Sequence, residues 1–196
     1  MRDRTTVDSQ RRALLAWPLA CSALASHGPA LGRSAPTPPP EIRSELPGAR
    51  LLGSGRLTFM LFHVYDARLW AGPEFAVARF DQVPLALELE YGRGFDSADI
   101  AERSIEEMQR SGPIAPEKVT RWMAAMKQAF PDVAEGDRTT GVQLPGVAAR
   151  FFVNGNFTGE IRDPEFTRLF FGIWLSVRTS EPRLREALLA GAPNGS

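Results

Sequence analysis

From Ala49 onward, apolar and polar positions occur in blocks that have the periods of strands and helices. The first block, ARLLGSGRLTFMLFHVYDARLW, predicts two apolar strands, around residues 49–58 and 60–70, joined by a tight hairpin. The segment LALELEY (85–91) then alternates large apolar residues with Ala86, Glu88 and Glu90. Strict alternation of this kind predicts a strand that is buried on one face.

Two helices are predicted next. Ser97 is suited to cap ADIAERSIEEMQR, whose apolar residues share one face, and Gly112-Pro113 ends this helix. Pro116 opens EKVTRWMAAMKQAF, which again has apolar residues at helical spacing, and Pro131 closes it. Helices that follow hairpin strands in blocks, rather than alternating with single strands, favour an α+β protein.

The remaining blocks return to strands and then to helices. TTGVQL (139–144), AARFFVN (148–154) and FTGEI (157–161) are predicted strands, and Asn154-Gly155 is a strong hairpin turn. Asp163-Pro164 starts the helix EFTRLFFGIWL, and Ser180 starts a last one. The pattern predicts an α+β fold, an antiparallel sheet with helices packed on one face (an open-faced β-sandwich), from roughly six strands and four helices.

The composition excludes several function classes. The formal net charge of the 196 residues is zero, and residues 36–196 carry 18 basic and 21 acidic side chains, so no nucleic acid partner is expected. Cys21 is the single cysteine, and His27 and His63 are the two histidines. A disulfide, a thiol nucleophile and a multi-histidine metal site are therefore not expected in the folded domain. No metal and no cofactor are predicted.

Residues 1–25 are typical of a signal peptide. Arg11 and Arg12 precede the apolar run ALLAWPLACSALA, which is too short to span a bilayer and ends in small residues. Export to the periplasm is expected, by the general or the twin-arginine route, with no integral membrane segment after removal of this leader. Residues 26–47 contain APTPPP and are expected to form a Pro-rich linker, residues 48–190 one domain, and residues 191–196 a disordered tail.

Familiar catalytic motifs are weak in this chain. Gly53-Ser54-Gly55 lacks the third glycine of a dinucleotide-binding loop and precedes a strand, and no GxSxG elbow is present. His63 lies within a predicted strand, where it either faces solvent or, if both faces are buried, lines a pocket. A structural or surface role is the favoured interpretation.

Arg56 and Tyr65 are the more informative pair. They lie on the two strands of the first hairpin, so both side chains could point into one space. A guanidinium beside a phenol offers several N–H and O–H donors to a carboxylate or an oxyanion. The alternative is an exposed arginine and a tyrosine of the core, and spacing alone favours that alternative.

At these residues the chain resembles the chalcone isomerase family. GSGRLTFMLFHVYDARLW is similar to the two characteristic strands of that family, and FFVNGNFTGEIRDPEFTRLFFGIWL is similar to its hairpin and closing helix. The similarity covers roughly residues 48–190 and is greatest to the bacterial chalcone isomerase-like proteins, which are exported. The family includes isomerases that close a flavanone ring and non-catalytic members that bind fatty acids.

The resemblance implies roles for particular residues. The shared arginine corresponds to Arg56, the tyrosine of the fatty-acid binders to Tyr65, and a hydroxyl that contacts flavonoids to Thr167. The tyrosine and the asparagine that the isomerases use are replaced by Asp96 and Arg103, which cannot form the same hydrogen bonds. These departures argue against chalcone isomerisation.

Three hypotheses follow. The first is a non-catalytic binder whose partner is a small amphipathic ligand such as a fatty acid, with its carboxylate on Arg56 and Tyr65. The second is an isomerase or intramolecular lyase acting on an enone, with Tyr65 or His63 as the acid–base group. The third is a structural or partner-binding protein whose pocket is filled by its own aromatic residues, such as Phe170 and Trp174 of the closing helix.

Overall fold

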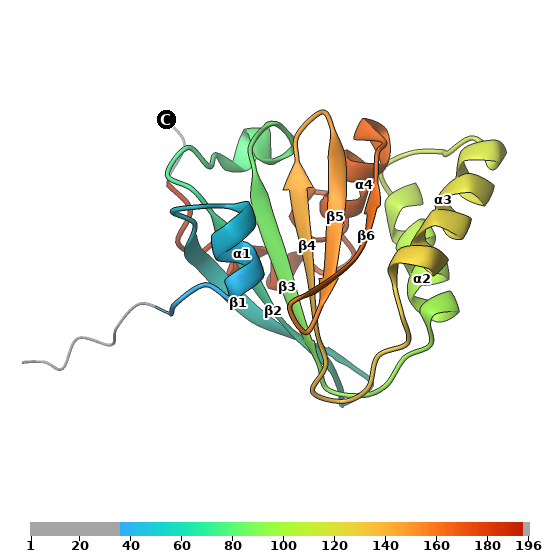
Figure 1. Cartoon of the computed structure of the whole chain (residues 1–196), viewed down its shortest axis with the longest axis horizontal. Coiled ribbons are helices and arrows are strands. Elements are labelled where there is room, and N and C mark those ends of the chain that lie inside the picture. The colour runs from blue at the N-terminus through green and yellow to red at the C-terminus, as the bar shows by residue number, and fades with distance from the viewer. Residues whose placement is uncertain (1–35, 194–196) are drawn as a thin grey trace, which may run out of the picture. The chain divides into compact units, whose positions relative to one another are not determined.

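A computed structural model describes residues 36–193 of the chain. These residues form one six-stranded antiparallel sheet in which each strand pairs with its neighbours in the sequence, in the order β1 to β6 (Figure 1). The strands are β1 (Arg50–Phe59), β2 (Phe62–Ala71), β3 (Leu85–Tyr91), β4 (Arg138–Leu144), β5 (Ala148–Val153) and β6 (Asn156–Ile161). Such a meander needs only short or helical connections, and it confirms the α+β class predicted from the sequence.

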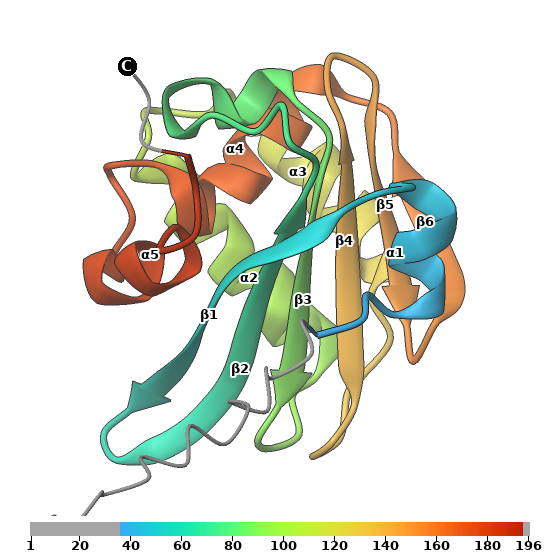
Figure 2. The ribbon, with the colours of Figure 1, turned by 90° about the vertical axis from the view of Figure 1, so that its left-hand side faces the viewer.

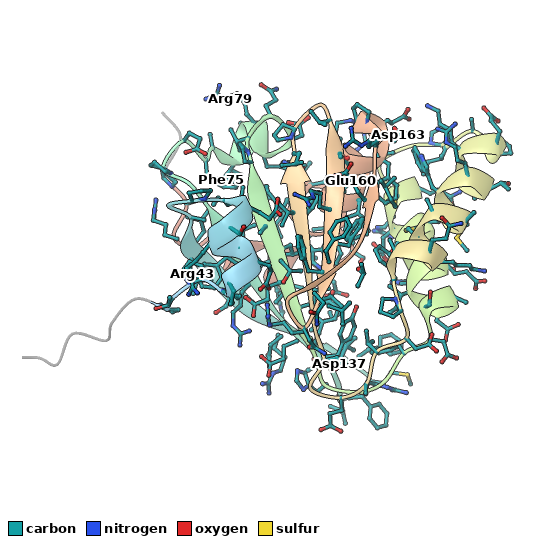
Figure 3. All side chains as sticks on the ribbon, in the orientation of Figure 1. Arg43, Phe75, Arg79, Asp137, Glu160 and Asp163 are labelled. Atoms are coloured by element: carbon teal, nitrogen blue, oxygen red, sulfur yellow. The ribbon has the colours of Figure 1, made fainter. Side chains whose placement is uncertain are left out.

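The helices α2 to α5 cover one face of this sheet, as predicted (Figure 2). They are α2 (Ser97–Gln109), α3 (Pro116–Ala129), α4 (Pro164–Leu175) and α5 (Pro182–Leu188). The side chain of Asp163 accepts hydrogen bonds from the backbone N–H groups of Glu165 and Phe166, which fixes the start of α4. Figure 3 places Asp163 at one end of the sheet and Asp137, where β4 begins, at the other.

The opposite face of the sheet carries α1 (Pro40–Glu45), and a 3₁₀ helix η1 (Val77–Gln82) lies between β2 and β3. The helix α1 falls inside the segment that the sequence suggested to be an irregular linker. Ile42 and Leu46 are buried against Trp70 and Val142, which form a second, smaller core. Because α1 covers this face, the alternating strand β3 is buried on both sides rather than on one.

The burial of Glu88 on β3 is the clearest consequence of the cover by α1. A strand buried on one face only would leave Glu88 in solvent, yet it is buried, accepts a hydrogen bond from Trp70 Nε1 at 2.8 Å and pairs with Arg68. A buried carboxylate requires such partners. The apolar alternation of LALELEY predicted the strand correctly, but it carried no information about the helix α1 at residues 40–45.

A β-bulge in the first hairpin decides which side chains share a face. Next to the turn, Phe59 pairs with Phe62 and Thr58 with His63. Farther from the turn the register changes by one residue, so that Leu57 pairs with Tyr65 and Arg56 with Asp66. Val64 is the additional residue of β2 at this step. A slip of one residue transfers a side chain to the other face of a strand. Without the bulge, Arg56 would lie directly opposite Tyr65.

The predicted signal peptide of residues 1–25 lies outside the described residues, as do residues 194–196. Near the end of the described part, the backbone N–H of Gly191 donates to the carbonyl of Leu52 at 2.7 Å, which ties the segment after α5 to β1. Within residues 36–193, no helix is both long enough and apolar enough to cross a membrane.

Candidate ligand pocket

A cavity of about 530 Å³ lies between the sheet and the helices α2, α3 and α4. Its inner wall is largely apolar and comes from the sheet and from the helices that cover this face. The sheet contributes residues such as Leu57, Leu87, Leu89 and Phe151. The helices contribute Ile100, Phe170, Ile173 and Trp174, and Phe130 lies just after α3. Cavities of about 300–1,000 Å³ with mostly apolar walls are typical of sites for small organic ligands.

Aromatic residues of α4 both build the core and form the cavity wall. Phe166 and Phe171 are fully buried, and Phe170 contacts both of them as well as Trp174. These aromatics therefore pack in the core. They do not fill the space, because the cavity remains beside Phe170 and Trp174.

Tyr65 is the sequence-predicted site residue that lines this cavity. Its hydroxyl oxygen accepts a hydrogen bond from Trp174 Nε1 at 3.0 Å, which leaves the phenolic proton available to a ligand. Burial of the phenol, together with Tyr91 and the carboxylates of Glu181 and Glu107, raises the pKa of Tyr65 well above its usual value. The phenol is therefore neutral at physiological pH and can only donate or accept a hydrogen bond.

Arg56 lies elsewhere. Its guanidinium donates two hydrogen bonds to Asp66, at 2.7 and 2.9 Å, and its side chain is 59% exposed. The bulge at Val64 puts this pair on the face of the hairpin away from the cavity, while Leu57 and Tyr65 face inward. The structure therefore does not bring Arg56 and Tyr65 together, and the two side chains do not form a shared carboxylate-binding site.

The other two candidates are also outside the cavity wall. Thr167 is buried, and its hydroxyl donates to the carbonyl of Asp163 at 2.9 Å within its own helix. His63 packs against Gly92, where a Cβ would lie 2.2 Å from its Nδ1 atom, and its Nε2 atom lies 3.4 Å from Asp66. An acid–base role for His63 toward a ligand in the cavity has no geometric support.

Arg93 is the residue that sequence reasoning missed. It follows β3, lines the cavity and is exposed to solvent, so it lies at the mouth. Its guanidinium carbon is 5.4 Å from the ring centre of Phe95 and 5.9 Å from that of Phe62. Among the described residues no carboxylate lies within ion-pair distance of Arg93. A single arginine in a loop gives no sequence signal, and only the fold reveals its position.

The other charged residues of the wall are paired or acidic. Arg103 forms ion pairs with Glu106 and with the buried Glu107. Glu107 and Glu181 both lie near enough to Tyr65 to raise its pKa. Beside Tyr65 an anionic group would be repelled by Glu181, and less by Glu107, which is paired with Arg103. At the mouth Arg93 would attract it, although Asp99 also lies there. Within the described residues, no group of three or more His, Cys, Asp or Glu side chains could hold a metal ion.

The fold and this cavity define a class of protein with an apolar pocket enclosed between an antiparallel sheet and its covering helices. Comparison with known proteins then identifies the family. A model of the chalcone isomerase-like family matches residues 43–190, so the chain belongs to that family and the resemblance seen in its sequence is confirmed.

Two relatives show how far the likeness extends. An uncharacterized protein of Haemophilus influenzae is 25% identical over 138 residues, which are 70% of this chain and 66% of that protein, slightly less than two thirds. Among solved structures, the Arabidopsis thaliana fatty-acid binding protein AtFAP1 matches with a TM-score of 0.56 and 13% identity. The match covers 73% of this chain and 87% of AtFAP1, and it supports the shared fold.

Proposed function

We propose that this protein binds an amphipathic carboxylate, such as a fatty acid, without transforming it. One observation carries the proposal: a largely apolar cavity of about 530 Å³ opens beside Arg93, an arginine without a carboxylate partner among the described residues. In this arrangement the apolar tail lies between the sheet and the helices, and the carboxylate lies at the mouth. The fatty-acid binding neighbour with the same fold supports the proposal.

Arg93 is the residue proposed to hold the carboxylate. Its guanidinium lies over two aromatic rings, which orient it without neutralising its charge. Tyr65 is proposed to line the inner part of the cavity, where its neutral hydroxyl can bond a polar atom of the ligand. The positions of Glu107 and Glu181 argue against placing the carboxylate next to Tyr65.

The proposed cellular location of the protein is the periplasm, as the leader sequence suggests. Export to the periplasm is a proposal that rests on residues 1–25, which lie outside the described part of the chain. An exported binder of this class would carry or buffer an apolar acid that is poorly soluble in the aqueous compartment.

Titration with saturated carboxylic acids of increasing length tests the proposed function. Burial of each methylene is worth about 0.8 kcal/mol, which corresponds to about a fourfold gain in affinity per carbon. We expect this gain to continue until the cavity is filled and then to stop. The primary alcohol of the same length should bind more weakly than the acid.

The control is a variant with a smaller cavity. Ile100→Trp places a larger side chain at the α2 side of the wall and should lower the chain length at which the affinity gain stops. If affinity does not depend on chain length, or if Ile100→Trp folds and leaves the dependence unchanged, the tail does not occupy this cavity and the proposal fails.

A further inference from the structure

The tip of the β1–β2 hairpin is an exposed apolar surface. Phe59, Met60 and Phe62 are 63–76% exposed, and Leu61 is fully exposed. Three other large apolar residues of the described chain are also exposed, but they lie singly in other segments. Four consecutive apolar residues at a protruding turn are different from scattered ones, because contiguous exposed apolar surface marks interaction sites. Figure 2 shows this hairpin extending away from β3 and the strands beyond it.

The turn itself is held in a conformation that its residues do not favour. Met60 and Leu61 have φ angles of 47° and 71°, in the left-handed region that costs free energy for residues with a side chain. The β5–β6 turn of the same protein has similar angles, 50° and 83°, but it uses Asn154 and Gly155, which suit them. Stability of the hairpin therefore does not explain methionine and leucine at positions 60 and 61.

The tip is continuous with the cavity. Phe59 and Phe62 are exposed to solvent and also line the cavity, so an apolar surface leads from the tip to the interior. Arg93 lies at the base of the tip, with its guanidinium over the ring of Phe62. An apolar tail that enters here would meet the aromatic side chains of Phe59 and Phe62, beside Arg93.

The shape and chemistry of the tip fit a lipid bilayer. The tip extends about two residues beyond the Thr58–His63 pair, or about 7 Å, which is close to the depth at which interfacial segments bury their apolar side chains. A narrow two-residue turn offers little area to a protein partner. Arg93 at its base is placed where lipid phosphates would lie.

The charged residues near the tip predict which lipid compositions the tip should bind. Asp96, Asp99 and Asp132 line a shallow hollow together with Arg93, so this end of the molecule has no basic surplus. Attraction to anionic lipid should therefore be weak, and burial of apolar side chains should supply the affinity.

We propose that residues 59–62 insert into the interfacial layer of a phospholipid bilayer, so that the cavity exchanges its amphipathic ligand with that layer. The second part of this inference rests on the proposed function, whereas the insertion itself does not. The partner is a lipid surface, and the driving force is the burial of Phe59, Met60, Leu61 and Phe62.

Site-specific fluorescence tests the insertion on the full chain, so that residues 1–35 are the same in every variant. Cys21→Ser removes the native thiol, and an environment-sensitive dye is attached at Leu61→Cys or, as a matched control, at Val177→Cys, another exposed apolar position. With vesicles of phosphatidylcholine we expect a blue shift at position 61 and none at position 177. Adding phosphatidylglycerol should change little.

A second variant links the tip to ligand exchange. Met60→Asn/Leu61→Gly gives the turn the residues it favours, so it should fold well while losing two apolar side chains. We expect it to slow the transfer of a fluorescent fatty acid from vesicles about tenfold or more and to leave fatty acid affinity in vesicle-free solution unchanged.

The possible results separate the two proposals. If position 61 shows no shift with either vesicle, or shifts only through concentration-dependent self-association without vesicles, insertion is refuted. If position 61 shifts but no fatty acid binds in solution, insertion stands and the proposed function fails. If fatty acid binds and the Asn-Gly variant transfers it at the original rate, the exchange route is refuted.

Discussion

Arg93→Gln should weaken fatty acid binding, and Arg56→Gln should not. Both substitutions remove one positive charge from an exposed arginine on the same end of the sheet, so they are closely matched. Arg93 lines the cavity mouth, whereas Arg56 is held by two hydrogen bonds to Asp66 on the outward face. The difference between them depends on the one-residue bulge at Val64.

The size of the effect follows from the exposure of Arg93. An ion pair at an exposed position contributes about 0.2–1 kcal/mol, so the loss of the guanidinium should raise the dissociation constant by up to about fivefold. Arg93→Glu replaces attraction by repulsion, and it should raise the constant by up to about thirtyfold for the same reason. Both effects should shrink as salt is added, because the site is open to solvent.

Calorimetric titration of each variant with one long-chain acid, at two salt concentrations, measures these effects. The matching alcohol is the internal control, because its affinity should be the same for the native protein and for Arg93→Gln. The reasoning would be refuted if Arg56→Gln weakened the acid and Arg93→Gln did not. That result would favour a hairpin register in which Arg56 lies opposite Tyr65 rather than opposite Asp66.

Three further predictions concern the domain that holds the cavity. Tyr65 and Tyr91 are the two tyrosines of the chain, and burial raises the pKa of both, that of Tyr91 to about 12. Absorbance titration should therefore show no phenolate near pH 10 until the protein unfolds. The free energy of unfolding should fall as pH rises above 10. A phenolate signal near pH 10 from folded protein would contradict the burial of the two tyrosines. Burial alone would raise the pKa of Glu41, but its hydrogen bonds with Arg138 and Thr140 hold it below the usual value. The stability that this shift contributes is present above about pH 4.5 and is lost as pH falls below it. Glu41→Gln should therefore make the free energy of unfolding depend less on pH in the acid range. If the dependence is unchanged, the pairing of Glu41 with Arg138 is not its cause. At Gly53, a Cβ would lie 2.2 Å from the carbonyl oxygen of Ala187. Gly53→Val should therefore displace α5 and lower the free energy of unfolding, measured with denaturant, by about 1–3 kcal/mol. Ser54→Val is the control, because Ser54 is exposed, and it should lower the free energy of unfolding far less.

The sequence was sufficient for the elements that have strong local signals. The helix that starts at Asp163-Pro164 and the Asn154-Gly155 turn are specified by residues within one turn of the chain, and both are present. The helix α1 was missed because six residues in a proline-rich segment have no useful periodicity. Its cover over the sheet then changed the environment of Glu88, which no local pattern could indicate.

The site was harder to predict because it depends on register. Arg56 and Tyr65 are nine residues apart, and a regular two-residue hairpin would have placed them side by side. The extra residue at Val64 moves Tyr65 to the inner face and leaves Arg56 outside. A bulge has no reliable sequence signature, so the hypothesis of a shared receptor was reasonable from spacing and is not supported by the fold. In the structure Tyr65 lines the cavity, whereas Thr167 and Arg56 do not.

Photolabelling locates the tail of the bound acid and shows whether it lies between the sheet and the helices. A long-chain fatty acid with a diazirine at its terminal carbon would be bound to the full chain, irradiated, and the labelled residues identified by mass spectrometry. We predict labels on the inner wall, at Leu87 and Leu89 of β3 or at Phe170, Ile173 and Trp174 of α4. Labels confined to the hairpin tip or to the α1 side of the sheet would show that the space between sheet and helices does not receive the acid.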